Sequence, residues 1–189
     1  MALSVVAFVG LLALVGVLRG VELGISREHQ RALSERGARQ AEDPHFVWMV
    51  TLHAAILIGA ALEVLLLARP FIPVLAVISG VVFLFANLLR WWVIYTLGTH
   101  WNVRVMDSGS LGVVTSGPFR LIRHPNYVAV FLELLALPLI HTAWITALAG
   151  SAAHLWVLSK RLTVEEAVLA RHANYRSLMM DKPRFLPRL

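Results

Sequence analysis

The chain has 189 residues, of which 58% are hydrophobic and 15% charged, with a formal net charge of +6 and no cysteine. A soluble domain carries about 25% charged residues and disorder requires low hydrophobicity, so the composition excludes both classes. A mean hydropathy of +0.72 favours a membrane protein over a nucleic-acid-binding one, and the lack of cysteine excludes disulfides, thiolate metal sites and cysteine nucleophiles.

The first apolar run covers residues 2–18 and ends at Arg19. No basic segment precedes it and no small-residue cleavage site follows it, so we expect a retained membrane helix rather than a secretory signal peptide. Gly16, Gly20 and Gly24 recur every four residues, a spacing typical of close helix packing. We expect that packing within the chain rather than at a dimer seam.

The later apolar runs cover residues 47–68, 71–97, 127–140 and 143–159. The run at 127–140 is short, because its length in a helix is about 21 Å and the hydrocarbon core of a bilayer is about 30 Å thick. Pro125 suits the first turn of that helix, and Pro138 is expected to end or kink it. The pattern predicts an all-α polytopic membrane protein with about five transmembrane helices, the last two forming a tight hairpin.

Polar residues are concentrated in the segments 19–46, 98–126 and 160–189, which hold 15 of the 17 lysines and arginines. Five helices put these segments on one side of the membrane, and the positive-inside rule assigns that side to the cytoplasm and the N-terminus to the outside. Apolar spacing over 162–178 predicts an amphipathic helix at the C-terminus.

The polar segments hold the best candidates for a site. Arg123 and His124 stand directly before a helix N-terminus, where backbone N–H groups can bind a carboxylate. The plainer interpretation is that Arg123 meets lipid phosphate and His124 caps the helix. Glu165 and Glu166 are about 100° apart on a helix, so only one of them has to face a pocket. Arg161 and Glu165 are expected to form a solvated surface pair.

Several ionisable residues interrupt the apolar runs, and such residues at membrane depth suggest function. They are His53, Glu63, Arg90, Glu133 and His154. His53 and His154 fit packing against a neighbouring helix as well as they fit a pocket. Glu133 is the better placed for a cavity. No spacing of metal ligands is present, so no metal site is predicted.

Several motifs occur in a characteristic order: Gly-Pro-Phe-Arg at 117–120, Arg-His-Pro-Asn-Tyr at 123–127, the hairpin, Glu-Glu at 165–166 and Pro-Arg-Phe-x-Pro at 183–187. Over about residues 90–187 the chain resembles the isoprenylcysteine carboxyl methyltransferase family, and it shares much with the phospholipid methyltransferases. Leu97-Gly98-x-x-Trp101 is similar to bacterial members. The resemblance implies a membrane enzyme that uses S-adenosylmethionine to methylate a lipophilic acceptor.

The resemblance also implies a set of cofactor-binding residues, namely Gly117, Pro118, Arg123, His124, Pro125, Tyr127, Glu165 and Glu166. His124 and Tyr127 would line the pocket. Arg123 and His124 suit the carboxylate of the methionine part, and a glutamate suits its ammonium or the ribose. The chain is then one domain, 1–189, with three helices in 1–97, and with the cofactor-binding loop, the hairpin and the C-terminal helix in 98–189.

Two classes of acceptor stay open, each with its own candidate catalytic residues. A carboxylate is already ionised and needs only a cation to orient it, for which Arg104, Arg176 and Arg184 are candidates. A phenol or enol needs a base; the candidates are His100, His53 and Glu133. The resemblance implies an acceptor that is an isoprenoid carboxylate or a polyketide-type lipid hydroxyl, and we expect it to be delivered laterally from the bilayer.

Further expectations concern alternative functions, the membrane in which the protein lies and its partners. The alternative enzyme is a phospholipid headgroup N-methyltransferase, and the non-enzymatic alternative is a helical membrane scaffold or transporter subunit. The alanine- and arginine-rich composition resembles a bacterial protein, which predicts the bacterial inner membrane with the active site facing the cytoplasm. The expected partners are membrane lipids and a lipophilic small-molecule substrate, not nucleic acid, and the chain is expected to be a monomer or homodimer.

Overall fold

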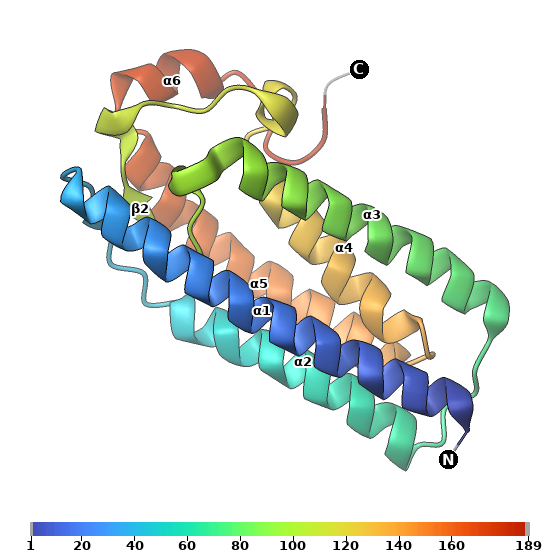
Figure 1. Ribbon diagram of the computed structural model, residues 1–189. Coiled ribbons are helices and arrows are strands. Elements are labelled where there is room, and N and C mark those ends of the chain that lie inside the picture. Colours follow the sequence, from blue (N-terminus) through green and yellow to red (C-terminus); the bar gives the residue numbers. More distant parts are fainter. Residues whose placement is uncertain (1, 188–189) are drawn as a thin grey trace.

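A computed structural model describes residues 2–187, and it is mostly helical (Figure 1). The α-helices are α1 (Leu3–Glu35), α2 (Phe46–Leu66), α3 (Pro73–Leu97), α4 (Pro125–Leu139), α5 (Trp144–Leu169) and α6 (Ala173–Met179). Short 3₁₀ turns lie at Gly98–His100, Gly109–Leu111 and Gly117–Arg120. The all-α prediction is correct apart from one small feature: β1 (Arg39–Gln40) pairs antiparallel with β2 (Met106–Asp107).

Three helices, α1, α2 and α3, are long and apolar enough to cross a membrane. Large apolar side chains such as Trp48, Leu84 and Leu88 are exposed on their outer faces, as expected for contact with lipid. α4 has 15 residues, begins with Pro125 in its first turn and ends one residue after Pro138, so both proline predictions are confirmed. The count of five spans stays a prediction.

Two helices are longer than the apolar pattern predicts. α1 continues through the polar residues after Leu18 as far as Glu35. α5 continues beyond the apolar run to Leu169, and the amphipathic helix expected over 162–178 is instead the end of α5 followed, after a break at 170–172, by the seven-residue α6. Arg161 and Leu162 are buried within α5, so packing continues along the helix where the apolar run ends.

The helices form one bundle in which α3 lies along α4, and α5 packs against both α2 and α4 (Figure 1). α1 and α2 lie side by side. The connections 36–45 and 98–124 and the segment after α5 gather at one end of the bundle, and the N-terminus lies at the other. The polar segments that hold most of the basic residues therefore meet, and a site between them can form.

The glycines of α1 do not support close packing, contrary to the prediction. A Cβ atom at Gly20 or Gly24 would meet nothing within 4 Å, and one at Gly16 would meet only the Leu57 side chain at 3.8 Å. Close approach occurs instead at Gly150 of α5, where a Cβ would lie 2.7 Å from the Ile56 side chain of α2. Gly16 and Gly20 border a cavity, so their lack of side chains leaves open space.

Candidate active site

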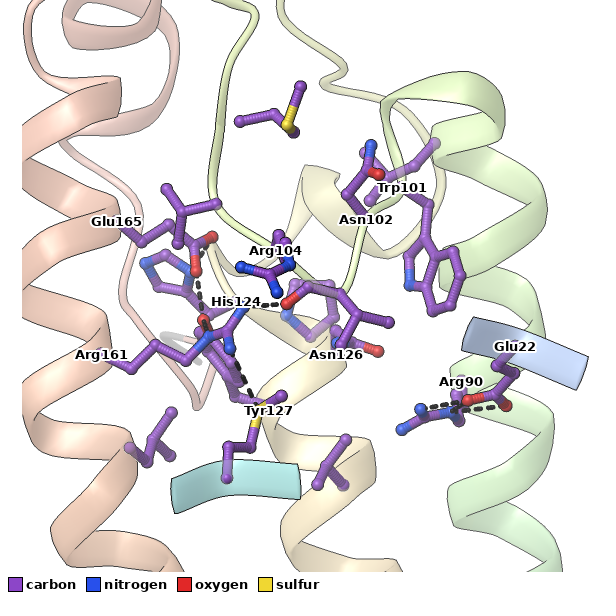
Figure 2. A pocket seen from close by; sticks show the side chains of 18 of the residues that line it. Glu22, Arg90, Trp101, Asn102, Arg104, His124, Asn126, Tyr127, Arg161 and Glu165 are labelled. Carbon is purple, nitrogen blue, oxygen red and sulfur yellow. Dashed lines mark hydrogen bonds and ion pairs between the residues drawn. The ribbon is translucent and has the colours of Figure 1, made fainter. Parts of the chain in front are cut away.

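A cavity of about 500 Å³ opens between the helices and the connection 98–124, a size typical of small-molecule sites. Its polar half lies at the end of the bundle where the polar connections meet and is lined by Asn102, Arg104, His124, Tyr127, Arg161 and Glu165 (Figure 2). Its apolar half extends between the helices and is lined by Gly16, Val50, Ala54, Leu57 and Val130. The cavity therefore suits a polar ligand beside an apolar one.

The start of α4 positions the first polar side chains. His124 occupies the N-cap position with non-helical backbone angles, and Pro125 follows in the first turn. His124 is buried, its ring nitrogen Nε2 lies 3.1 Å from Glu166 Oε1, and its ring stacks at a tilt on Tyr127 with centroids 5.6 Å apart. The Tyr127 hydroxyl donates a hydrogen bond to the Glu165 carboxylate.

The two adjacent glutamates of α5 point to different places. Glu165 lines the cavity, whereas Glu166 does not. Glu166 binds Arg123 at 3.1 Å and Arg184 at 2.6 Å. Burial acts to raise the pKa of Glu166, which lies beyond the apolar run of α5, but hydrogen bonds from Arg184 and His124 outweigh burial and hold the pKa below its ordinary value. Glu165 thus faces the ligand space, and Glu166 holds the surrounding loops.

Arg161 connects three parts of the polar half, and the expectation of a solvated pair with Glu165 is wrong. Its guanidinium is buried, lies 3.2 Å from Asp43 Oδ2, donates to the Val103 carbonyl and donates to the Tyr127 hydroxyl at 3.3 Å. The positions 154, 161 and 165 share one face of α5, so the helical spacing could have identified Arg161 as a residue that faces the cavity. Nothing local in the sequence pointed to Asp43.

Several buried polar atoms of the cavity wall have no hydrogen-bond partner among residues 2–187: Trp101 Nε1, Asn126 Oδ1 and the Tyr175 hydroxyl. Buried polar groups in folded proteins are almost always paired. Burial raises the pKa of Tyr175 to about 12, so its hydroxyl stays protonated at neutral pH. These atoms offer a ligand at least two donors and an acceptor.

Some of the predicted site residues line the cavity and others lie outside it. Those that line the cavity are His100, Arg104, Arg123, His124, Pro125, Tyr127 and Glu165. Those that do not are Gly117, Pro118, Glu133, Arg176 and Glu166. Burial and the nearby Arg36 lower the pKa of His100, so it is neutral at pH 7. Arg104 lies over the Phe46 ring at 4.0 Å and has no ion-pair partner within 2–187.

Gly117 shapes the turn that supports the cavity rather than the wall itself. Its φ is +56°, and a Cβ there would lie 2.6 Å from Thr96 Oγ1 of α3. Only glycine meets both conditions easily. Phe119 from the same turn reaches the cavity instead.

The C-terminal Pro-Arg-Phe segment pairs with the loop that carries His124. The backbone N–H groups of Arg123 and His124 donate to the carbonyls of Pro183 and Arg184, at 2.9 and 3.0 Å. Lys182 donates to the Phe119 carbonyl at 2.7 Å. This strap, residues 182–184, explains physically why the terminal motif accompanies the Arg-His-Pro motif some sixty residues before it.

A group of four charged side chains crosses the bundle below the polar half. Arg90 of α3 makes a bidentate pair with Glu22 of α1, and Arg19 lies 2.8 Å from Glu22 (Figure 2). Glu133 of α4 lies 3.5 Å from Arg19 and 3.9 Å from Arg90. Two positive and two negative charges make this charged quartet neutral, which offsets the cost of burying them.

Fold and site define a helical membrane protein with a cavity that is polar at one end and mainly apolar at the other. The chain belongs to the isoprenylcysteine carboxyl methyltransferase (ICMT) family, whose model matches residues 76–171. It is 28% identical over 167 residues to the uncharacterized protein YpbQ of Bacillus subtilis (strain 168), covering 86% of this chain and 96% of that protein.

A second bacterial relative is an uncharacterized protein of Haemophilus influenzae (strain ATCC 51907 / DSM 11121 / KW20 / Rd). It is 29% identical over 154 residues, which cover 81% of this chain and 89% of that protein. The resemblance predicted from the motifs is therefore confirmed, and membership of the family indicates a membrane methyltransferase.

Proposed function

We propose that this protein is an S-adenosylmethionine-dependent methyltransferase that O-methylates a lipophilic acceptor, either an isoprenoid carboxylate or a polyketide-type lipid hydroxyl. The chief support is a cavity whose polar half carries hydrogen-bonding groups that have no partner among residues 2–187 and whose other half is mainly apolar. Such a cavity suits a charged, water-soluble methyl donor beside a lipid. A scaffold protein has no need of this combination.

The residues of the polar half fit the cofactor. S-adenosylmethionine carries a carboxylate, an ammonium group, ribose hydroxyls and an adenine ring, and when bound it supplies an electrophilic methyl group on a sulfonium. Glu165 is held by Tyr127 and offers acceptor oxygens for the hydroxyls or the ammonium. The unpaired Trp101 Nε1 and Asn126 Oδ1 offer a donor and an acceptor for polar atoms of the ligand.

Arg104 is the stronger candidate for the cofactor carboxylate. Arg123 is already paired with Glu166 at 3.1 Å, whereas Arg104 lines the cavity without an acidic partner within 2–187. An arginine stacked on an aromatic ring keeps its donor edge available for a carboxylate. This assignment moves Arg104 from the acceptor, where sequence reasoning put it, to the cofactor.

The bundle supplies orientation and the exclusion of water. Methyl transfer is an in-line displacement, so holding the acceptor oxygen and the methyl carbon in line accounts for much of the rate. Apolar residues of α1, α2 and α4 border the inner half, so the lipid part of the acceptor would lie there, delivered from the bilayer. The polar half would face the cytoplasm of a bacterial cell, as the basic connections predict.

Glu165 provides the test of cofactor binding. Glu165→Gln should weaken binding of S-adenosylhomocysteine, measured by calorimetry on purified protein, by about tenfold or more, since a charge-assisted hydrogen bond is lost. Glu35→Gln, at an exposed glutamate outside the cavity, should leave the affinity unchanged. Wild-type protein without affinity for S-adenosylhomocysteine or S-adenosylmethionine would refute the proposal.

A further inference from the structure

Two histidines face each other in the inner half of the cavity. His53 of α2 and His154 of α5 both line it, and their rings are 5.6 Å apart with an interplanar angle of 88°. His154 is 3% exposed, and neither of its ring nitrogens has a hydrogen-bond partner among residues 2–187. An imidazole buried in this way has a donor and an acceptor left unsatisfied, which is unfavourable unless a ligand pairs with them.

His53 is oriented by its own helix. Its Nδ1 lies 2.7 Å from the Met49 carbonyl oxygen, which can only accept, so Nδ1 carries the proton. In the neutral ring Nε2 is then an acceptor. The pair His53–His154 therefore offers acceptor nitrogens in the inner half of the cavity, beside the charged side chains of Arg19, Glu22 and Arg90.

The arginines nearest this pair, Arg19, Arg90 and Arg161, are each already paired with a carboxylate. Arg19 and Arg90 also line the cavity, but both are paired with Glu22 and approach Glu133. The charged quartet is neutral, so a carboxylate placed beside it would be a buried charge without a counter-ion. A neutral hydroxyl needs no counter-ion and donates its proton to an imidazole nitrogen.

His154 also lies on the correct face of its helix. It shares one face of α5 with Arg161 and Glu165, about 10 Å deeper along the helix axis than Arg161. The candidate bases His100 and Glu133 are less suitable. Glu133 does not line the cavity, and His100 belongs to the turn at its polar end.

We propose that His154, with His53 beside it, binds the hydroxyl of the acceptor and receives its proton, so that the substrate is a phenol- or enol-bearing lipid rather than a carboxylate. This inference rests on the proposed function and decides between its two acceptor classes. The acceptor O–H bond breaks and its proton moves to a ring nitrogen of His154. The oxygen bonds to the methyl carbon as the carbon–sulfur bond breaks, and sulfur keeps the electron pair.

The charges of this step balance. One positive charge leaves the sulfonium and one appears on the imidazole, while the acceptor becomes a neutral methyl ether. The cavity as a whole therefore keeps its net charge, although the positive charge moves from the cofactor in the polar half to the imidazole in the inner half. His154 returns its proton to water once the products have left.

Binding of matched probes tests the inference without turnover. The probes are 4-octylphenol, 4-octylanisole and 4-octylbenzoate, which share the octylphenyl body and differ in the polar group. Equilibrium binding of each labelled probe to protein in lipid nanodiscs is measured against empty nanodiscs, in wild type, His154→Phe and His154→Asn. The control is His141→Phe, at a buried histidine whose Nδ1 also has no hydrogen-bond partner within residues 2–187 but which lies outside the cavity.

The expected result is that wild type binds 4-octylphenol about tenfold more tightly than 4-octylanisole or 4-octylbenzoate, as for one hydrogen bond in a dry site. His154→Phe should abolish the preference, His141→Phe should keep it, and His154→Asn should keep part of it. No preference for the phenol, a preference for the benzoate, or a preference that survives His154→Phe would overturn the inference. Binding of S-adenosylhomocysteine, measured separately, should be unchanged in His154→Phe. If wild-type protein did not bind S-adenosylhomocysteine, that result would refute the proposed function instead.

Discussion

At the scale of residues, the polar half of the cavity depends on side chains that hold one another. Tyr127 donates to Glu165 and accepts from Arg161, which in turn pairs with Asp43. The motif residues among these were predicted from the sequence. Asp43 and Arg161 were not, because their pairing joins positions more than a hundred residues apart and becomes visible only when α5 packs against the chain before α2.

The buried Arg161–Asp43 pair leads to a prediction about the stability of the protein. Both side chains are buried, so Arg161→Met should leave the Asp43 carboxylate unpaired and destabilise the protein by ~3 kcal/mol. The double variant Arg161→Met/Asp43→Asn should recover much of the loss, because the uncompensated charge is removed. Unfolding of the detergent-solubilised protein measures both. A double variant no more stable than Arg161→Met would contradict the pairing.

At the scale of elements, helix positions were largely predictable and helix lengths were not. The run 71–97 became α3 (Pro73–Leu97), and 127–140 became α4 (Pro125–Leu139). The polar residues that end the first apolar run do not end α1, because Arg19 and Glu22 are paired across the bundle with residues of α3 and α4. An apolar pattern along one helix does not reveal such partners.

The strap of residues 182–184 and its anchor Glu166 make a prediction about pH. The pKa of Glu166 is lower in the folded protein than its ordinary value of 4.5, so the unfolded chain takes up the proton first as the pH falls. The ion pairs of Glu166 contribute about 2 kcal/mol to the stability of the folded protein. This contribution is full above pH 4.5 and is lost as the pH falls through the lower pKa that Glu166 has in the folded protein. Thermal unfolding across this range should show a larger acid-induced fall in Tm for wild type than for Glu166→Gln. Glu35→Gln should follow wild type; equal falls in wild type and Glu166→Gln would contradict the anchor role.

At the scale of the whole molecule, the bundle brings three polar segments to one end and leaves apolar space inside (Figure 1). That gathering was predictable from the number of apolar runs and the distribution of basic residues. The cavity itself was not, because it arises where α1 carries glycines without close neighbours and where the charged quartet holds α1 to α3 and α4. This arrangement supports the proposal that the site joins a water-soluble cofactor to a lipid acceptor.

Transfer of a labelled methyl group tests this account most directly. Membranes containing the protein and a bacterial lipid extract are incubated with methyl-labelled S-adenosylmethionine, and the lipids are extracted. We predict label in a lipid product that survives alkaline hydrolysis, as a methyl ether does and a methyl ester does not, with the signal greatly reduced in Glu165→Gln. Extracted lipids carrying no more label than membranes without the protein would contradict the account.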